Sequence, residues 1–201
     1  MHVDSWAQKA KQAGYRSRAV FKLEEILQTI KKIKILGNVL DLGAAPGGWS
    51  QFIKKKYPNS QIYAVDILEM DPIDGVNFFL DSIDNISNIE PILKLKGDFD
   101  LVISDIAPNL SGISAVDSEN IFELNKLTIE VASNFLKTGG YLVMKTFQNN
   151  MLKSLRKDME LSFKIVQTYK PAASKKQSGD CLLYTSPSPR DLSTSRMPSS
   201  A

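Results

Sequence analysis

Short runs of apolar residues alternate with longer stretches in which apolar residues recur at helical spacing. Runs that are apolar almost throughout are typical of strands buried on both faces of a parallel sheet. They predict strands at 39–42, 61–68, 76–80, 99–106, 141–147 and 163–169, and a last strand that begins near residue 181. The alternation of strand and helix along the chain predicts an open α/β fold with a largely parallel sheet.

The amphipathic stretches give the helices of this fold. The segment 5–36 predicts one or two helices, because Gly14-Tyr15 interrupts its pattern and Ser17 is a plausible N-cap for the second part. Further helices are predicted at 49–57, 83–95, 117–137 and 149–161. Gly139-Gly140 is expected to stop the helix that precedes it.

Residues 38–51, NVLDLGAAPGGWSQ, have the pattern of a strand, a glycine-rich turn and the start of a helix. Gly43 and Gly47 can adopt positive φ and allow a ligand to approach the backbone, and the following helix offers free N–H groups. The spacing G-x-x-x-G-G matches neither the dinucleotide fingerprint nor a Walker loop. Asp41, before the first glycine, suits a ligand with a positive group better than a pyrophosphate. The alternative is a tight connection that binds nothing.

Several polar or glycine positions fall where predicted strands end: Gly43, Asp66, Asp81, Asp105 and Lys145. Ligands of open α/β sheets bind at the carboxyl ends of the strands, so we expect these positions to share one site. Asp66 follows the glycine turn by about 20 residues, where an acidic side chain commonly meets ribose hydroxyls.

Charge is unevenly distributed along a chain whose net charge is +3. Residues 1–60 carry 11 Lys and Arg against 4 Asp and Glu, residues 61–144 carry 4 against 14, and residues 145–201 carry 10 against 4. Basic ends around an acidic middle indicate contact with a polyanion, with ordinary solvated helix faces as the alternative.

Other classes of protein are excluded by composition. A single cysteine, Cys181, and a single histidine, His2, exclude a disulfide framework and a Cys/His zinc cluster. No apolar run reaches the roughly 18 residues of a transmembrane helix, and no signal peptide is visible. We therefore expect a soluble cytoplasmic protein without a metal or membrane partner.

Five motifs, in this order and at this spacing, resemble the FtsJ/RrmJ (RlmE) family of 2′-O-ribose RNA methyltransferases. They are RSRAVFKLEEI (16–26), VLDLGAAPGGWSQ (39–51), VDILEMDPIDGV (65–76), VISDIAPNLSG (102–112) and LVMKTFQ (142–148). The likeness covers roughly residues 5–184. It implies a Rossmann-like, class I S-adenosyl-L-methionine-dependent methyltransferase domain over 1–184, with a mostly parallel seven-stranded sheet, helices on both faces and an antiparallel last strand.

The resemblance also implies a catalytic Lys-Asp-Lys-Glu set, which falls on Lys22, Asp105, Lys145 and Asp180. Asp180 stands where the family has glutamate, so this side chain is one methylene shorter. S-adenosyl-L-methionine is the implied cofactor. With the glycines of the turn, the expected cofactor-binding residues are Gly43, Gly47, Gly48, Trp49, Asp66, Asp81 and Asp105.

Two roles stay open for Lys145: a base that takes the proton of the ribose hydroxyl, or a cation that stabilises the developing oxyanion. Trp49 either packs on the cofactor or fills the core. Lys9, Lys11, Arg16 and Arg18, in the basic segment 1–36, are expected to contact RNA phosphates. Trp6 and Tyr15 either stack on bases or pack against the protein.

The expected function is 2′-O-methylation of a ribose in 23S-type large-subunit rRNA, at a uridine of the A-loop within the 50S particle, by a monomer. A tRNA or an mRNA cap is the alternative substrate. A ribosome-assembly factor that binds the cofactor without catalysis is the alternative class. The glycine spacing disfavours a nicotinamide dehydrogenase.

Residues 185–201 change character. They are rich in serine and proline and lack periodicity, so we expect no contribution to the core. Their sequence resembles translated sequencing adapter more than a native segment, and a natural disordered tail is the alternative.

Overall fold

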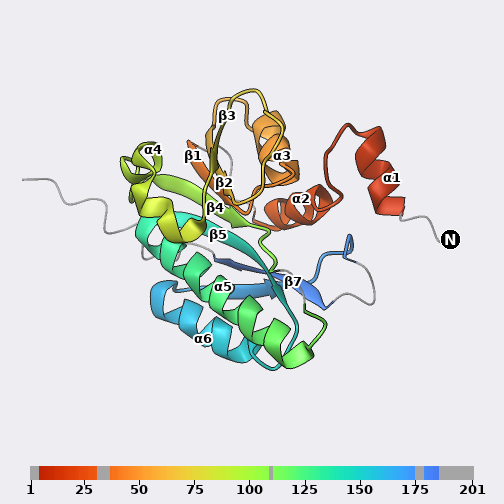
Figure 1. The fold of residues 1–201 in the computed structure, drawn as a ribbon, viewed down its shortest axis with the longest axis vertical. Helices are drawn as coiled ribbons and strands as arrows, with labels where there is room; N and C mark the ends of the chain where they lie inside the picture. Colours follow the sequence, from red (N-terminus) through yellow and green to blue (C-terminus); the bar gives the residue numbers. More distant parts are fainter. Residues whose placement is uncertain (1–4, 31–36, 109–110, 175–178, 186–201) are drawn as a thin grey trace, which may run out of the picture.

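The computed structural model describes residues 5–30, 37–108, 111–174 and 179–185. Within them one seven-stranded sheet has the order β3-β2-β1-β4-β5-β7-β6 (Figure 1). Strand β7 pairs antiparallel with β5 and β6, and the other neighbours are parallel, which confirms the predicted sheet. The strands are β1 (Asn38–Leu42), β2 (Gln61–Asp66), β3 (Val76–Leu80), β4 (Phe99–Ser104), β5 (Leu136–Phe147), β6 (Val166–Tyr169) and β7 (Asp180–Thr185).

Helices cover both faces of this sheet (Figure 1). Helices α1 to α3 lie on one face and α5 and α6 on the other, and the 3₁₀ helix η1 and the short α4 share the core cluster of α5 and α6. Their bounds are α1 (Ser5–Gln12), α2 (Val20–Thr29), α3 (Gly48–Lys56), η1 (Ile83–Asn88), α4 (Glu90–Leu93), α5 (Ser114–Phe135) and α6 (Leu152–Ser162). No helix among the described residues is long and apolar enough to cross a membrane.

The core has two layers because successive side chains of a strand point to opposite faces. Leu101, Ile103 and Val143 pack with α2 and α3, whereas Val102, Leu142 and Met144 pack with α5 and α6. We call the first of these the α2–α3 face. This face is important for the site. A polar residue that lies two positions after one of these apolar residues on a strand points to the same face.

The predicted helix 83–95 is wrong as a single element. It is divided into η1 and α4 at Ile89, whose backbone is extended. Pro91 lies in the first turn of α4, where its missing N–H is tolerated, but it would interrupt a helix running through from residue 83.

The predicted helix 117–137 has different limits, because α5 begins at Ser114 and ends at Phe135. Leu136 already pairs with Phe99, so sheet pairing ends the helix. Gly139, with φ of 80°, lies within β5, where the register with β4 shifts, and does not stop the helix as expected.

Other element limits shift by a few residues. β2 and β4 end two residues earlier than predicted, at Asp66 and Ser104, whereas β6 and α6 begin three residues later. At Asp66 the cause is local: the carboxylate accepts a hydrogen bond from the Leu68 backbone N–H and turns the chain.

The expected start of the non-core tail at residue 185 is wrong by one position. Thr185 belongs to β7, is buried, and its hydroxyl accepts a hydrogen bond from the Leu142 N–H at 2.9 Å. Residues 186–201 lie outside the described part of the chain, as do His2 and residues 31–36.

A charged residue lies inside this fold on β1. Asp41 is 1% exposed and accepts a hydrogen bond from the Ser50 hydroxyl of α3 at 2.6 Å. Burial, with smaller contributions from the charges of Asp105 and Asp66, raises the pKa of Asp41 to about 7, although the Ser50 hydrogen bond opposes this. Its ordinary value is about 4, so the folded protein binds this proton more tightly than the unfolded chain between about pH 4 and pH 7.

Protonated Asp41 therefore adds stability at low pH that is lost as the pH rises through about 7. We compare the unfolding free energy of Asp41→Asn with that of wild type at pH 5 and at pH 8. We expect this difference to shift in favour of the variant by about 2 kcal/mol between the two pH values. Urea unfolding of both proteins at the two pH values measures this difference. Asp74→Asn, at an exposed loop position, is the control and should show no such change. Parallel pH dependence of Asp41→Asn and wild type would contradict the assignment.

Candidate active site

The glycine turn joins β1 to α3 at the carboxyl edge of the sheet. The backbone N–H groups of Gly43 and Ala44 donate to the Val65 carbonyl at 2.8 and 3.2 Å, which ties the turn to β2. Gly43 has φ of 70°, and a Cβ there would lie 3.1 Å from the Ile106 Cα. A side chain is therefore excluded, and the turn lies directly against the segment that carries Asp105.

Gly47 is the N-cap of α3 and has φ of 100°. A Cβ on it would meet the side chains of Met70 and Ile73 at 2.7 and 2.6 Å, so the loop after β2 packs onto it. The Arg16 guanidinium fastens this arrangement by donating to the carbonyls of Pro46, Asp71 and Pro72 at 3.2, 2.6 and 2.8 Å. Arg16 thus has loop carbonyls as partners, whereas we expected RNA phosphates.

Asp66 and Asp81 lie at the ends of β2 and β3. The two Asp66 oxygens accept the backbone N–H groups of Ala45 and Leu68, both at 2.8 Å. Asp81 accepts from the Ser82 N–H and the Asn85 amide at 2.7 and 2.9 Å. A carboxylate has about four acceptor sites, so both side chains are held in place and retain capacity for hydroxyl or amino donors.

Trp49 is a core residue here. Its side chain is 3% exposed and packs with α2, and its indole N–H donates to the Ala19 carbonyl at 2.8 Å. This packing joins the start of α3 to α2. Trp49 also lines a small pocket with Asp41, so its cofactor contact stays a prediction.

Two lysine–aspartate pairs lie near this turn. Lys145 Nζ is 2.9 Å from Asp105 Oδ1 and donates to the Asp105 carbonyl at 2.6 Å. Lys22 of α2 donates to Asp180 Oδ2 in a direct contact, and both residues are buried, at 7% and 4% exposed. Asp180, which stands where the resemblance implies glutamate, therefore reaches Lys22 with its shorter side chain.

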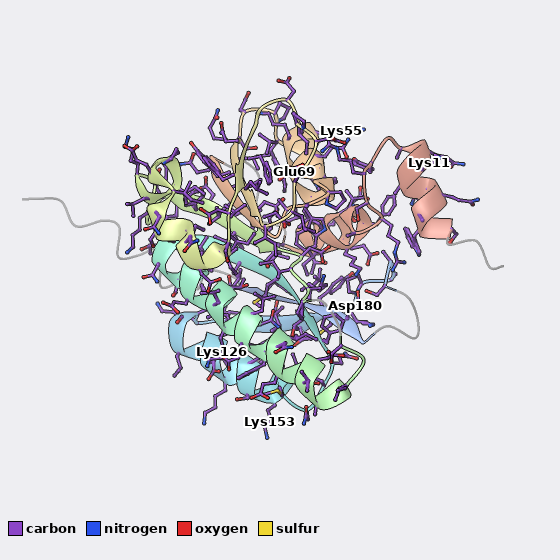
Figure 2. All side chains as sticks on the ribbon, viewed as in Figure 1. Lys11, Lys55, Glu69, Lys126, Lys153 and Asp180 are labelled. Atoms are coloured by element: carbon purple, nitrogen blue, oxygen red, sulfur yellow. The ribbon has the colours of Figure 1, made fainter. Side chains whose placement is uncertain are left out.

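Strand pairing brings the two pairs together. Phe147 of β5 lies opposite Asp180 of β7, so Lys145 and Asp180 are diagonal neighbours on the same face, roughly 7–8 Å apart. Asp105 is two positions beyond Ile103, which places it on the α2–α3 face as well. The structure thus gathers Lys22, Asp105, Lys145 and Asp180 at one edge of one face, and Figure 2 shows Asp180 where β7 begins, below α2.

Asp41, which the sequence suggests for a positively charged ligand, is not among the expected cofactor-binding residues, but the structure makes it a candidate. Its Oδ1 is buried and has no hydrogen-bond partner among the described residues. It lines a small pocket with Ser17, Gly43, Ala44, Trp49 and Asp105. The sequence feature that could have identified it is a charged residue within the apolar run NVLDL. Burial of a carboxylate is costly, so such a residue indicates a specific partner or ligand.

This pocket fits part of S-adenosyl-L-methionine. It has a volume of about 10 Å³, which is room for about one water-sized group such as an ammonium, and the unpartnered Asp41 Oδ1 that lines it suits a positive charge. Ile67 and Leu68, 70% and 63% exposed, follow Asp66 on the open part of the edge. The residues present are therefore compatible with a ligand whose cationic end is enclosed and whose remainder lies on open surface.

A larger hollow of about 790 Å³ lies on the opposite face, between η1, α5 and α6. Its lining includes Asp84, Glu123 and Asp158, and none of the predicted site residues. The size of this hollow does not make it the active site, because the predicted catalytic and cofactor-binding residues lie elsewhere. We therefore place the candidate site at the carboxyl edge of the sheet.

The N-terminal aromatic residues pack against the protein. Trp6 and Tyr15 contact the Phe21 ring, with centroids 5.2 and 6.4 Å away. Lys9 Nζ lies over the rings of Trp6 and Phe21, at 5.0 and 4.8 Å. Lys11 is exposed on α1, and Figure 2 shows it on the same side of the molecule as Lys55 of α3.

Known proteins resemble this chain in sequence and in fold. "Ribosomal RNA large subunit methyltransferase E" of Xanthomonas campestris pv. campestris is 41% identical over 181 residues, 89% of this chain and 86% of that protein. The protein of the same name from Stenotrophomonas maltophilia is 40% identical over 178 residues, 87% of this chain and 85% of that one.

Solved structures share the fold. A crystal structure named as a ribosomal RNA methyltransferase from Plasmodium falciparum superposes with a TM-score of 0.74 at 28% identity, over 86% of this chain and 98% of that one. Human methyltransferase-like protein 13 in complex with SAH superposes with a TM-score of 0.59 at 15% identity, over 88% and 83%.

The family model described as FtsJ-like methyltransferase matches residues 15–185, which include the glycine turn and both lysine–aspartate pairs. The chain therefore belongs to the FtsJ-like methyltransferase family, whose methyl donor is S-adenosyl-L-methionine.

Proposed function

We propose that this protein transfers a methyl group from S-adenosyl-L-methionine to a ribose 2′-oxygen of large-subunit ribosomal RNA, at a uridine of the A-loop in the 50S particle. The observation that carries the proposal is the gathering of Lys22, Asp105, Lys145 and Asp180 beside the glycine turn. The names of the relatives, which are about 40% identical, support the choice of substrate. A ribosomal substrate implies that the protein acts in the cytoplasm.

S-adenosyl-L-methionine supplies a methyl group on a sulfonium, and the transfer forms a C–O bond, breaks the S–CH₃ bond and releases the hydroxyl proton. The cofactor would be held by Asp41 at its positive end and by Asp66 and Asp81 through their remaining acceptor sites. Gly43 and Gly47, both with positive φ, let Ile106, Met70 and Ile73 pack against the turn, which fixes its shape beside the cofactor.

Lys145 would orient the nucleophile. It meets two acceptors on Asp105, the carboxylate and the backbone carbonyl, and an ammonium has three donors, so one remains for the ribose oxygen. In this arrangement Lys145 would act as a cation that stabilises negative charge as it develops on the oxygen. The Asp105 carboxylate is then the adjacent acceptor for the proton. Lys22 and Asp180 would flank the same edge.

A tRNA or an mRNA cap is the alternative substrate for the same reaction, because each also presents ribose hydroxyls. The direct test is transfer of a tritiated methyl group to 50S particles, free 23S rRNA and tRNA in parallel, followed by mapping of the modified atom. We expect label at one ribose 2′-oxygen of the 50S particle. Label on a base, or on tRNA alone, would contradict the proposal, and cofactor binding without transfer would favour an assembly factor.

The two roles of Lys145 predict different behaviour of its variants. Lys145→Ala should lower single-turnover methyl transfer at least a thousandfold while cofactor affinity changes less than threefold, because no cofactor contact is assigned to it. If Lys145 acts as a cation, Lys145→Arg should retain roughly a hundredth or more of the wild-type rate, since arginine keeps the charge. An inactive arginine variant would favour the base, and a fully active alanine variant would remove Lys145 from the mechanism.

RNA contact by the N-terminal lysines predicts a change in salt dependence. Lys9→Ala and Lys11→Ala should each reduce the slope of log affinity against log salt by about one, measured by RNA binding at several salt concentrations. Lys153→Ala, exposed on α6 across the sheet, is the matched control and should keep the wild-type slope. Arg16→Ala should instead weaken cofactor binding, because Arg16 fastens the loops around Gly47. Unchanged slopes in both lysine variants would place the RNA elsewhere.

A further inference from the structure

Asp180 lies in a corner formed by α2, residues 170–174 and the first residue of β7. Its carboxylate contacts Lys22 and also accepts the Ser174 hydroxyl at 3.2 Å. The side chain is 4% exposed, so its position is set by the protein and not by solvent (Figure 2).

Lys170 holds Asp180 in two ways. It directly follows β6, and its Nζ donates to the Asp180 backbone carbonyl. The same nitrogen lies 3.9 Å from Asp180 Oδ1. One ammonium therefore fixes the main chain at the start of β7 and lies within ion-pair distance of the carboxylate.

Residues on both sides of this lysine are anchored to α2, the helix that carries Lys22, by backbone N–H groups after it and by a side-chain hydroxyl before it. Glu25, one turn after Lys22, accepts the backbone N–H groups of Ala172 and Ala173 at 2.8 and 3.0 Å. It also accepts the Tyr169 hydroxyl at 3.3 Å. Lys170 is thus placed relative to Lys22 by a carboxylate on the same helix.

This arrangement matters because aspartate has little reach. A carboxylate one methylene shorter than glutamate meets Lys22 only if the backbone at residue 180 is held near α2, and Lys170 grips that carbonyl directly. The ammonium of Lys170 also adds a positive charge beside the buried pair of Lys22 and Asp180, on a side chain that is itself partly exposed.

We propose that Lys170 is a positioning residue for methyl transfer, which acts through Asp180 on Lys22 and on the charge at the ribose-binding edge. The inference rests on the proposed function, since it assigns Lys170 to the same reaction. A direct contact between Lys170 and an RNA phosphate is the competing explanation for any loss of activity, because its side chain is 37% exposed.

A double-mutant cycle with Asp180 distinguishes the positioning role of Lys170 from direct contact with an RNA phosphate. Lys170→Met should lower kcat at least tenfold, with KM for RNA and cofactor affinity within twofold of wild type, and Lys170→Arg should restore most of kcat. In an Asp180→Asn background, Lys170→Met should cost less than twofold, because the group through which it acts is already altered. Lys153→Met is the matched control and should leave kcat unchanged.

A second readout does not depend on turnover. In protein labelled with ¹³C at aspartate carboxyls, the Asp180 resonance, assigned from Asp180→Asn, should shift in Lys170→Met and not in Lys153→Met. This chemical shift tests the coupling of Lys170 to Asp180 even if Asp180→Asn is too slow for its kcat to be measured. The test also remains valid if methyl mapping shows that the modified atom is not a ribose oxygen.

Three results would overturn the inference: unchanged kcat in Lys170→Met, an equal loss in the Asp180→Asn background, or an unmoved Asp180 resonance. A rise in KM for RNA with unchanged kcat would assign Lys170 to direct phosphate contact instead.

Discussion

The two-residue period of side chains along paired strands is the constraint on which this site depends. It places Asp41, Asp105 and Lys145 on the face that α2 and α3 cover, each at the carboxyl end of its strand. The antiparallel β7 adds Asp180 from its own first residue, because that end meets the same edge. A shift of one residue in any of these pairings would turn the side chain toward α5 and α6.

Three carboxylates and a lysine lie close together at this edge. Asp66 and Asp105 are close enough to Asp41 for their charges to raise its pKa. Lys145 forms an ion pair with Asp105. Asp41 has only Ser50 as a hydrogen-bond partner among the described side chains around it. We infer that the site is arranged to receive a cation, and a sulfonium donor that also carries an ammonium supplies one.

Much of the fold could be predicted from sequence because long apolar runs report burial directly. The seven strands and the gathering of Asp105 and Lys145 follow from where such runs end. Local competition could not be predicted: sheet pairing of Leu136 ended α5 early, and Pro91 divided the helix expected at 83–95. The partners of Arg16 and the contacts of Lys170 depend on loops that meet only after folding, so no periodicity reveals them.

The sheet order also explains why the hollow of about 790 Å³ is not the candidate site. The groove between α5 and α6 lies on the other face, away from the glycine turn and from both lysine–aspartate pairs. The central claim is that the ligand binds at the α2–α3 face, and a crystal structure with S-adenosylhomocysteine tests it most directly. The account predicts the amino-acid end of this molecule within hydrogen-bond distance of Asp41 and its ribose beside Asp66. Density for the molecule between α5 and α6, with the glycine turn empty, would contradict it.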